Sequence, residues 1–351
     1  MKPLFPALLS AALAIALFPA AACHKQARPA ATFTNPIGVG ADPWIVRHNG
    51  YYYRTLTDTD GGVAIWRSDS PVASGERKIV WRAPDTGPHS TQIWAPELHF
   101  LDGRWYIYAT AANENNDKHR MIVLESATDD PLSDYTFKSE LYTGNDIVTQ
   151  KTNDWAIDGT VFTRDGKLYF IWSGRQDRHS GSLWLYIAPM SNPWTISGNR
   201  VRLCANDDYQ WERVGDSMEK SGINEAPEIL QHNGRTFLVY SASSSWQTTH
   251  KMGLLELIGD DPLAPGAWRK YPRPVFSPTA VTFGIGHASF VKSPDGKEDW
   301  MLYHVKQERR DGWSRIIFAQ PFHWTKDGFP DFGNPAVFGE SLPMPSGSPA
   351  H

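Results

Sequence analysis

A pattern that recurs five times along the chain limits its fold more than any other feature of the sequence. Each copy has an apolar stretch, a tight turn that ends in Gly, and a second stretch rich in aromatic residues. The copies lie at residues 42–56, 94–111, 158–174, 225–243 and 287–305, with turn glycines Gly50, Gly103, Gly166, Gly234 and Gly296. Asn-Gly or Asp-Gly between two apolar stretches is the strongest short-range signal of a β-hairpin. The sequence therefore predicts five β-hairpins.

The spacing of these hairpins predicts how they are assembled. Successive turn glycines are 53, 63, 68 and 62 residues apart. Each repeat thus has room for about four short strands, the usual content of one β-propeller blade. No long stretch shows the 3.6-residue periodicity and the capping residues of an α-helix. We therefore predict an all-β protein, a five-bladed β-propeller over residues 33–345 followed by a short tail at 346–351.

Composition excludes several classes of function. The chain of 351 residues has a formal net charge of −4, which gives no electrostatic reason to expect nucleic acid as a partner. Two cysteines are too few for a disulfide scaffold or a Cys-rich metal site. The unusual feature is the aromatic content of 15 Trp, 13 Tyr and 16 Phe, which indicates a surface that stacks on flat or ring-shaped ligands.

The N-terminal residues have the pattern of an export signal. Residues 1–22 begin with Met-Lys, continue with a run of Ala, Leu and Phe, and end in small residues before Cys23. The apolar run contains Pro6 and Pro19 and is too short for a transmembrane segment. Cys23 after three small residues also resembles the lipidation site of a bacterial lipoprotein. We expect an exported protein that is secreted, periplasmic or anchored to the cell envelope by a lipid on Cys23, with residues 23–32 as a tether.

One position in each repeat brings chemically active residues together. The residue that opens the first strand stands eight positions before the turn glycine in the first and third repeats, and nine before it in the others. These residues are Asp42, Trp94, Asp158, Glu225 and His287. The innermost strands of a propeller surround a central channel, so equivalent positions meet near the axis at one face. The repeat thus predicts one site with three carboxyl groups, an indole and an imidazole.

Three carboxyl groups in one place suit the cleavage of a glycosidic bond. Clustered carboxylates repel each other, so one of them keeps its proton near neutral pH. A protonated carboxyl can protonate the leaving oxygen while an ionised one activates water. Trp94 offers a flat apolar face to a sugar ring. Asp42-Pro43 and Asp158-Gly159 are ordinary turn pairs when taken singly, so the functional interpretation rests on the shared position in all five repeats.

In its motifs the chain resembles glycoside hydrolase family 43, a family of five-bladed β-propellers. The motifs are Gly40-Ala41-Asp42-Pro43-Trp44, Trp94-Ala95-Pro96-Glu97-Leu98, Trp155-Ala156-Ile157-Asp158-Gly159, Asn224-Glu225-Ala226-Pro227, Gly286-His287, and Arg315 ahead of Gln320-Pro321-Phe322. The resemblance implies that Asp42 is the general base, that Glu225 is the general acid, and that Asp158 orients the acid and modulates its pKa. It also implies inversion at the anomeric carbon. Many relatives have Gly in place of Ala226, and we expect this departure to alter packing beside Glu225 without abolishing activity.

The fuller pattern is most similar to the exo-acting α-L-arabinofuranosidases of this family, which cut α-1,5-linked arabinan from the non-reducing end. The resemblance implies arabinan, arabino-oligosaccharides or arabinoxylan side chains as substrates, and we expect contacts of the sugar with Trp94, His287 and Arg315. Trp246 and Trp172 follow the aromatic strands of the fourth and third repeats. Each of them is expected either to line the outer pocket, where Trp246 would contact the sugar, or to pack in the core. It implies no required cofactor, but a structural calcium or chloride ion near the propeller axis, contacted by His287 through water, is a further expectation. The few residues after the propeller leave no room for the C-terminal β-sandwich of many β-xylosidases, which favours arabinose.

Other functions fit the same sequence. An endo-arabinanase or a β-xylosidase of this family would use the same three carboxyl groups and differ in the loops around the pocket. A propeller that binds glycans without cleaving them would repeat its binding residues in every blade, whereas the five positions here differ from one another. A purely structural propeller would carry an exposed apolar patch in place of an acidic well.

Overall fold

Five antiparallel β-sheets follow one another along the chain in the computed structural model, which describes residues 1, 31–58, 60–176, 181–217 and 220–349. Residues from Ala31 onward pack as one unit. The predicted export signal at residues 1–22, with Cys23 and most of the tether, lies outside the described residues except for Met1. None of the described segments forms a helix with the length and apolar character that a bilayer crossing requires.

The first two sheets, blades I and II, are four-stranded meanders in chain order. Blade I consists of β3 (Ala41–His48), β4 (Tyr51–Thr57), β5 (Gly62–Ser68) and β6 (Glu76–Arg82). Blade II consists of β7 (Thr91–Leu101), β8 (Arg104–Ala112), β9 (Arg120–Ser126) and β10 (Tyr135–Glu140). The 3₁₀ turn η1 (Asn116–Lys118) joins β8 to β9.

The next two sheets, blades III and IV, repeat this plan. Blade III consists of β11 (Ala156–Arg164), β12 (Lys167–Arg175), β13 (Leu183–Asn192), β14 (Thr195–Ile196) and β15 (Val201–Cys204). Blade IV consists of β16 (Asn224–His232), β17 (Arg235–Ala242), β18 (Lys251–Leu257) and β19 (Trp268–Lys270). Two 3₁₀ turns, η2 (Gln210–Glu212) and η3 (Val214–Asp216), precede blade IV.

Blade V is completed by residues from the other end of the chain. It contains β20 (Gly286–Lys292), β21 (Asp299–Lys306), β22 (Arg315–Trp324) and β23 (Pro330–Asp331), and β2 (Gly38–Val39) pairs with β22 on its outer side. A second pair joins β1 (Thr32–Thr34) to β24 (Ser341–Pro343). The chain thus closes the ring through hydrogen bonds between its first and last strands, a feature that the repeat did not reveal.

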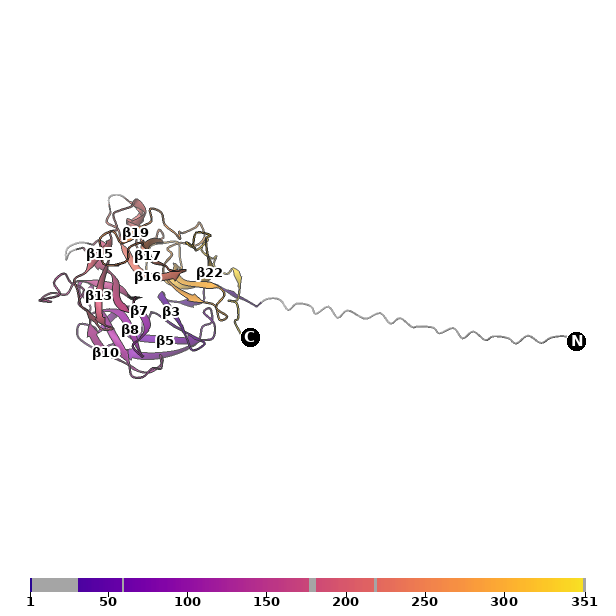
Figure 1. Cartoon of the computed structure of the whole chain (residues 1–351), viewed down its shortest axis with the longest axis horizontal. Helices are drawn as coiled ribbons and strands as arrows, with labels where there is room; N and C mark the ends of the chain where they lie inside the picture. Colours follow the sequence, from indigo (N-terminus) through magenta and orange to yellow (C-terminus); the bar gives the residue numbers. More distant parts are fainter. Residues whose placement is uncertain (2–30, 59, 177–180, 218–219, 350–351) are drawn as a thin grey trace. The chain divides into compact units, whose positions relative to one another are not determined.

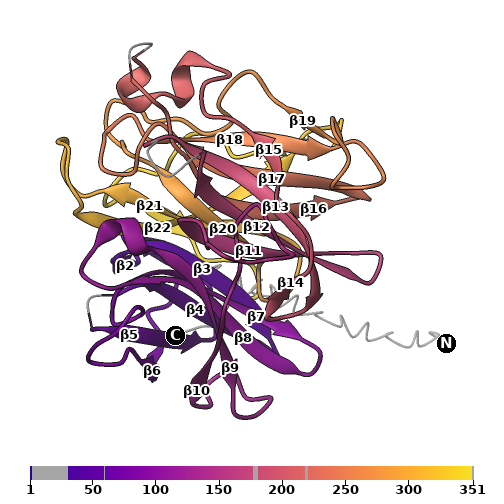
Figure 2. The ribbon, with the colours of Figure 1, turned by 90° about the vertical axis from the view of Figure 1, so that its left-hand side faces the viewer.

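The inner strands of the five sheets form a closed ring. Contacts join β3 to β7, β7 to β11, β11 to β16, β16 to β20, and β20 back to β3. Figure 1 shows β3, β7 and β16 near the middle of the ring, with β10, β15 and β19 towards its rim. Figure 2 shows β3–β10 in the lower part of the ring and β16–β22 in the upper part. The prediction of a five-bladed β-propeller is therefore confirmed, and the described residues contain no α-helix.

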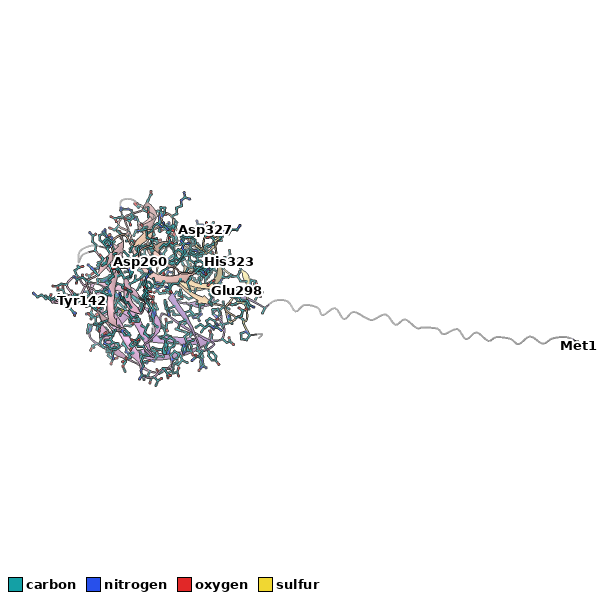
Figure 3. The ribbon with its side chains drawn as sticks, in the orientation of Figure 1. Met1, Tyr142, Asp260, Glu298, His323 and Asp327 are labelled. Atoms are coloured by element: carbon teal, nitrogen blue, oxygen red, sulfur yellow. The ribbon has the colours of Figure 1, made fainter. Side chains whose placement is uncertain are left out.

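Four of the five predicted hairpins turn in two residues. Asn49-Gly50, Asp102-Gly103, Asp165-Gly166 and Asn233-Gly234 all have positive φ at both residues. This is the type I′ turn, whose twist matches that of the flanking strands. In the fifth hairpin only Gly296 has positive φ, and the connection from β20 to β21 spans residues 293–298. Glu298 is labelled at this longer turn in Figure 3.

The aromatic residues mainly fill the spaces between blades. Five apolar clusters each combine buried side chains of two neighbouring sheets, as Tyr53 and Trp105 do between blades I and II. The largest fully buried side chains among the described residues are all aromatic, and they include Trp105, Trp172 and Trp300. The prediction of a ligand-stacking surface was therefore wrong for most of the aromatic residues. Their flat rings instead fill the space between two twisted sheets.

Candidate active site

A β-bulge in each inner strand determines where the predicted site residues stand. The pairing with the next strand skips two residues in every blade: after Ala41, Trp94, Ile157, Glu225 and Gly286. The first skipped residue always has a left-handed backbone: Asp42 (φ 57°), Ala95 (44°), Asp158 (53°), Ala226 (52°) and His287 (48°). Only three of the five residues predicted to be equivalent, Asp42, Asp158 and His287, therefore share this position.

Trp94 and Glu225 stand one residue earlier than the sequence register placed them. The second and fourth hairpins have the same two-residue turn as the first and third, so their turns absorb no extra residue. The count of eight back from the turn glycine therefore leads to Ala95 and Ala226. Only the fifth hairpin has a longer turn, so counting nine residues back from Gly296 correctly leads to His287.

All five predicted residues nevertheless line one pocket. It is a hollow of about 550 Å³ on the axis, and its wall also includes the two other predicted sugar contacts, Arg315 and Trp246. Trp155, Trp313 and His304 also line it, although the sequence predicted no role in the site for them. Trp172, on β12, is fully buried between blades II and III and belongs to the core.

A ring of hydrogen bonds holds the bulges in place. The N–H of the first bulge residue donates to a polar side chain on the second strand of the preceding blade. The pairs are Ala95 with Thr57 Oγ1 (2.7 Å), Asp158 with Thr110 Oγ1 (3.2 Å), His287 with Ser241 Oγ (2.7 Å) and Asp42 with His304 Nδ1 (3.3 Å). These acceptors stand seven residues after the turn glycine, or eight for His304. This second register in the sequence could have identified them.

The ring is interrupted at blade IV, and the exception places two carboxyl groups next to each other. The N–H of Ala226 donates to Asp158 Oδ2 (3.1 Å). The matching hydroxyl, Ser173 Oγ, donates to the carbonyl of Asn224 instead (2.6 Å). Asp158 is thereby tied to the residue that follows Glu225.

Asp42 is surrounded by positive and hydrogen-bonding groups. Arg315 Nη1 donates to Asp42 Oδ1 (3.1 Å), His287 Nδ1 lies 3.2 Å from the same oxygen, and Thr57 Oγ1 donates to Oδ2 (2.7 Å). Burial alone would raise the pKa of Asp42, but Arg315 and His287 outweigh it and hold this pKa well below its usual value. Burial acts against the charged form of His287, but Asp42 raises the pKa of that imidazole to about 9. Asp42 is therefore ionised at neutral pH.

Glu225 has the opposite environment. Its Oε1 is buried and has no hydrogen-bond partner among the described residues, and His250 Nε2 lies 3.9 Å from it. Burial, followed by the negative charges of Asp158 and Asp42, raises the pKa of Glu225 to about 8. Burial also raises the pKa of Asp158 to about 6, against the charge of His287. At neutral pH Glu225 is protonated beside an ionised Asp158.

A buried network behind Glu225 fixes the strand that carries it. The carboxylate of Glu212, in the 3₁₀ turn η2, accepts hydrogen bonds from Asn224 Nδ2 (2.9 Å) and the Tyr240 hydroxyl (2.9 Å). Lys270 Nζ lies 2.7 Å from the same oxygen. A buried charge pair of this kind is tolerated because each remaining donor is satisfied. The network therefore limits how far the Glu225 backbone can move.

One group of side chains among the described residues of the site could hold an ion. Donor atoms of Asp42, His287 and His304 lie within 4.8 Å of one another. Calcium takes six to eight oxygen ligands. Here two of the three groups offer nitrogen, and the single carboxylate is already paired with Arg315. These residues therefore do not fit a calcium site, and contact of His287 with an ion stays a prediction.

A protonated carboxyl and an ionised one in the same pocket are the equipment of a glycosidase, and this is the class that the fold and the site define. The chain belongs to the glycosyl hydrolases of family 43, whose sequence profile matches residues 33–330.

The alignments with named relatives cover most of the chain. It is 34% identical to an α-L-arabinofuranosidase 43 of Humicola insolens, over 91% of this chain and 66% of the relative. It is 33% identical to an extracellular exo-α-(1→5)-L-arabinofuranosidase of Streptomyces avermitilis, over 96% of this chain and 70% of the relative. The crystal structure of an α-L-arabinofuranosidase from Lactobacillus brevis matches with a TM-score of 0.78 and 34% identity, covering 88% of this chain and 98% of that one. The chain thus spans about two thirds of the length of the first two relatives.

Proposed function

We propose that the protein is an inverting exo-α-L-arabinofuranosidase that releases terminal arabinofuranose from α-1,5-linked arabinan and arabino-oligosaccharides. The observation that carries the proposal is the contrast between the two carboxyl groups of the pocket, the pKa of Asp42 being lowered and that of Glu225 raised to about 8. The choice of arabinose is supported by the similarity to relatives named for that activity. Arabinoxylan side chains carry the same terminal sugar and are included as substrates.

Each carboxyl group has a role in the proposed reaction. Glu225 gives its proton to the glycosidic oxygen as the bond to the anomeric carbon breaks. Asp42 takes a proton from the water that attacks this carbon from the opposite face, so the released sugar has inverted configuration. Asp158 keeps the pKa of Glu225 high through its charge and holds the Ala226 N–H next to the acid. Trp94, Trp246, His287 and Arg315 are proposed as contacts of the sugar.

The test is digestion of debranched arabinan, linear arabino-oligosaccharides and an aryl α-L-arabinofuranoside, with product analysis and NMR of the first anomer formed. We expect arabinose alone, released as the inverted β-anomer. Longer oligosaccharides would identify an endo-arabinanase, and xylose from xylo-oligosaccharides would identify a β-xylosidase. Binding of arabinan without any product would identify a glycan-binding propeller. Each of these three results contradicts the proposal.

Export is proposed on separate grounds. Residues 1–22 have the composition of a signal peptide, and the relative from Streptomyces avermitilis is named extracellular. Mass spectrometry of the mature N-terminus tests this proposal. A chain that starts at Cys23 with a lipid on its sulfur supports the envelope anchor, and a free N-terminus after cleavage supports secretion. A chain that still starts at Met1 contradicts both.

A further inference from the structure

Two loops at the rim of the pocket each present a tryptophan. Trp246 lies in the loop between β17 and β18, and Trp313 lies in the loop between β21 and β22. Their ring centroids are 5.7 Å apart at an angle of 50°, and both line the pocket. Trp246 also packs against a buried cluster that contains Ile223, while Trp313 is 64% exposed. An exposed indole that is fixed at the mouth of a pocket is available to a ligand.

A buried lysine ties the two loops together. Lys306, at the end of β21, is 5% exposed, and its Nζ donates to the carbonyl of Trp246 (2.9 Å) and to the carbonyl of Gly312. The N–H of Gly312 donates to the same Trp246 carbonyl (2.7 Å). A buried ammonium group is costly unless it is hydrogen-bonded, so these contacts hold both loops close to the lysine.

Two glycines make this arrangement feasible. A Cβ on Gly284 would lie 2.3 Å from Lys306 Cγ, so a side chain at this position would displace the lysine. Gly312 has a φ of 145°, which residues with a side chain rarely adopt. Gly284 thus leaves room for the Lys306 side chain, and Gly312 supplies one of its acceptors next to Trp313.

The same loop connects to the proposed base. Arg315 pairs with Lys306 across the β21–β22 register, and its guanidinium lies 5.7 Å from the centroid of the Trp313 ring. Arg315 also donates to Asp42 Oδ1. The Trp313 ring therefore contacts the guanidinium of Arg315, which in turn binds Asp42. Trp313 itself is exposed at the rim, whereas Asp42 and Glu225 are both buried.

We propose that Trp313, together with Trp246, is the platform for the sugar on the leaving-group side of the scissile bond, and that Lys306 is the positioning residue that holds this platform. This inference rests on the proposed function. The sugar that is cut off must reach both buried carboxyl groups, so the next sugar along the substrate extends outward to the rim. There an indole face can cover the apolar face of an arabinofuranosyl unit.

The first test compares two substrates in the Trp313→Ala variant. Arabinotriose has a sugar on the leaving-group side, whereas the fluoride of α-L-arabinofuranosyl fluoride is too small to reach the rim. We expect kcat/KM for arabinotriose to fall about tenfold more than kcat/KM for the fluoride, mostly through KM. Phe338→Ala is the matched control, because Phe338 is also 64% exposed but does not line the pocket, and it should change neither value.

The outcomes of this test are distinct. Equal losses on both substrates, or no loss, would overturn the platform while leaving the proposed function intact. A wild-type protein that cleaves neither substrate would instead reject the proposed function, and with it the assignment of a leaving-group side.

The second test is a double-mutant cycle between Lys306→Met and Trp313→Ala. If Lys306 acts through Trp313, the double variant loses no more on arabinotriose than Trp313→Ala alone. Additive losses would overturn the positioning role. Lys251→Met controls for removing a buried ammonium elsewhere, since Lys251 is 8% exposed and pairs with Asp216 outside the pocket. If Lys306→Met does not fold, Lys306→Arg takes its place in the cycle. The larger guanidinium cannot occupy the buried position of Lys306 Nζ between the carbonyls of Trp246 and Gly312, so the preference for arabinotriose over the fluoride should fall as far as it does in Trp313→Ala. An unchanged preference in a folded Lys306→Arg variant would contradict the positioning role.

Discussion

The two ends of the pocket place the same chemical group, a carboxyl, in opposite environments. At the end formed by blades I and V, Asp42 accepts from Arg315 and Thr57 and lies beside His287. At the end formed by blades III and IV, Glu225 Oε1 is buried and accepts no hydrogen bond from the residues that the structure describes. Both carboxyl groups are similarly buried, so burial alone does not distinguish them. Neighbouring charges, and not depth, therefore decide which carboxyl group is ionised and which one keeps its proton at neutral pH.

The largest effect is expected when the ionised carboxylate of Asp42 is replaced. Asp42→Asn keeps the size of the side chain but cannot accept a proton from water, so kcat should fall by about 10²–10⁴-fold on every substrate. Steady-state kinetics on arabinotriose and on an aryl arabinofuranoside measure this loss. Asp102→Asn, at the hairpin turn of blade II, is the control and should keep normal turnover. Near-normal kcat in Asp42→Asn would refute its role as base.

The next effect depends on the leaving group. Glu225→Gln cannot donate a proton, so arabinotriose should be cleaved about 10²–10⁴-fold more slowly. A substrate with a nitrophenolate leaving group needs less protonation and should lose much less activity. The measurement is the ratio of kcat values for the two substrates in the variant and in the wild type. A loss of the same size on both substrates would contradict the assignment of Glu225 as acid.

A smaller effect is expected from the coupling between Asp158 and Glu225, which both lie at the end formed by blades III and IV. Asp158 is negatively charged near neutral pH and raises the pKa of Glu225. Removing this charge in Asp158→Asn should lower that pKa, so the alkaline limb of kcat/KM should move to lower pH by about one unit. The wild-type limb is expected near pH 8, where Glu225 loses its proton. Asp165→Asn, at the turn of the same hairpin, should leave the limb in place, and an unmoved limb in Asp158→Asn would argue against the coupling.

The raised pKa of Glu225 should also make the free energy of unfolding depend on pH. The pKa of Glu225 is about 8 in the folded protein against an ordinary 4.5, so the folded state binds more protons than the unfolded state between these values. The free energy of unfolding must then fall as pH rises through this range. The Tm of Glu225→Gln minus the Tm of the wild type should therefore increase from pH 5 to pH 8 and stay constant above pH 8. Glu114→Gln, on the surface, should show no such trend in calorimetry.

The smallest effect concerns the bulge beside the acid. Ala226 has a φ of 52°, a conformation that costs an L-residue about 1 kcal/mol and that Gly adopts freely. The extra flexibility of Gly in the unfolded chain offsets part of the gain. Ala226→Gly should thus change the stability by less than about 1 kcal/mol, with kcat little altered. Ala95→Gly, at the same position in blade II, should behave alike in chemical denaturation, and a large loss in either variant would show that the methyl group packs productively.

The sequence allowed the fold and most of the pocket to be predicted. The Asn-Gly and Asp-Gly pairs predicted all five hairpins. Four of them form the type I′ turn that two adjacent residues specify, and the fifth, at Asp295-Gly296, has a longer connection. The catalytic candidates Asp42, Asp158 and Glu225 were found by their distance from these turns. The same counting placed Trp94 and Glu225 one residue out of register, because a bulge is defined by the pairing with the next strand and leaves no clear mark in the sequence.

By itself, the sequence determined the local elements: the turns, the alternation of the strands and the residue types available for chemistry. The tertiary structure alone decided which of these residues meet. Arg315 reaches Asp42 across 273 positions of the chain, and β2 completes blade V only once the ring has closed. The lowered pKa of Asp42 and the raised pKa of Glu225 are likewise properties of the assembled ring. Both depend on charges and burial supplied by other blades, and electrostatic interactions act through space and not along the chain.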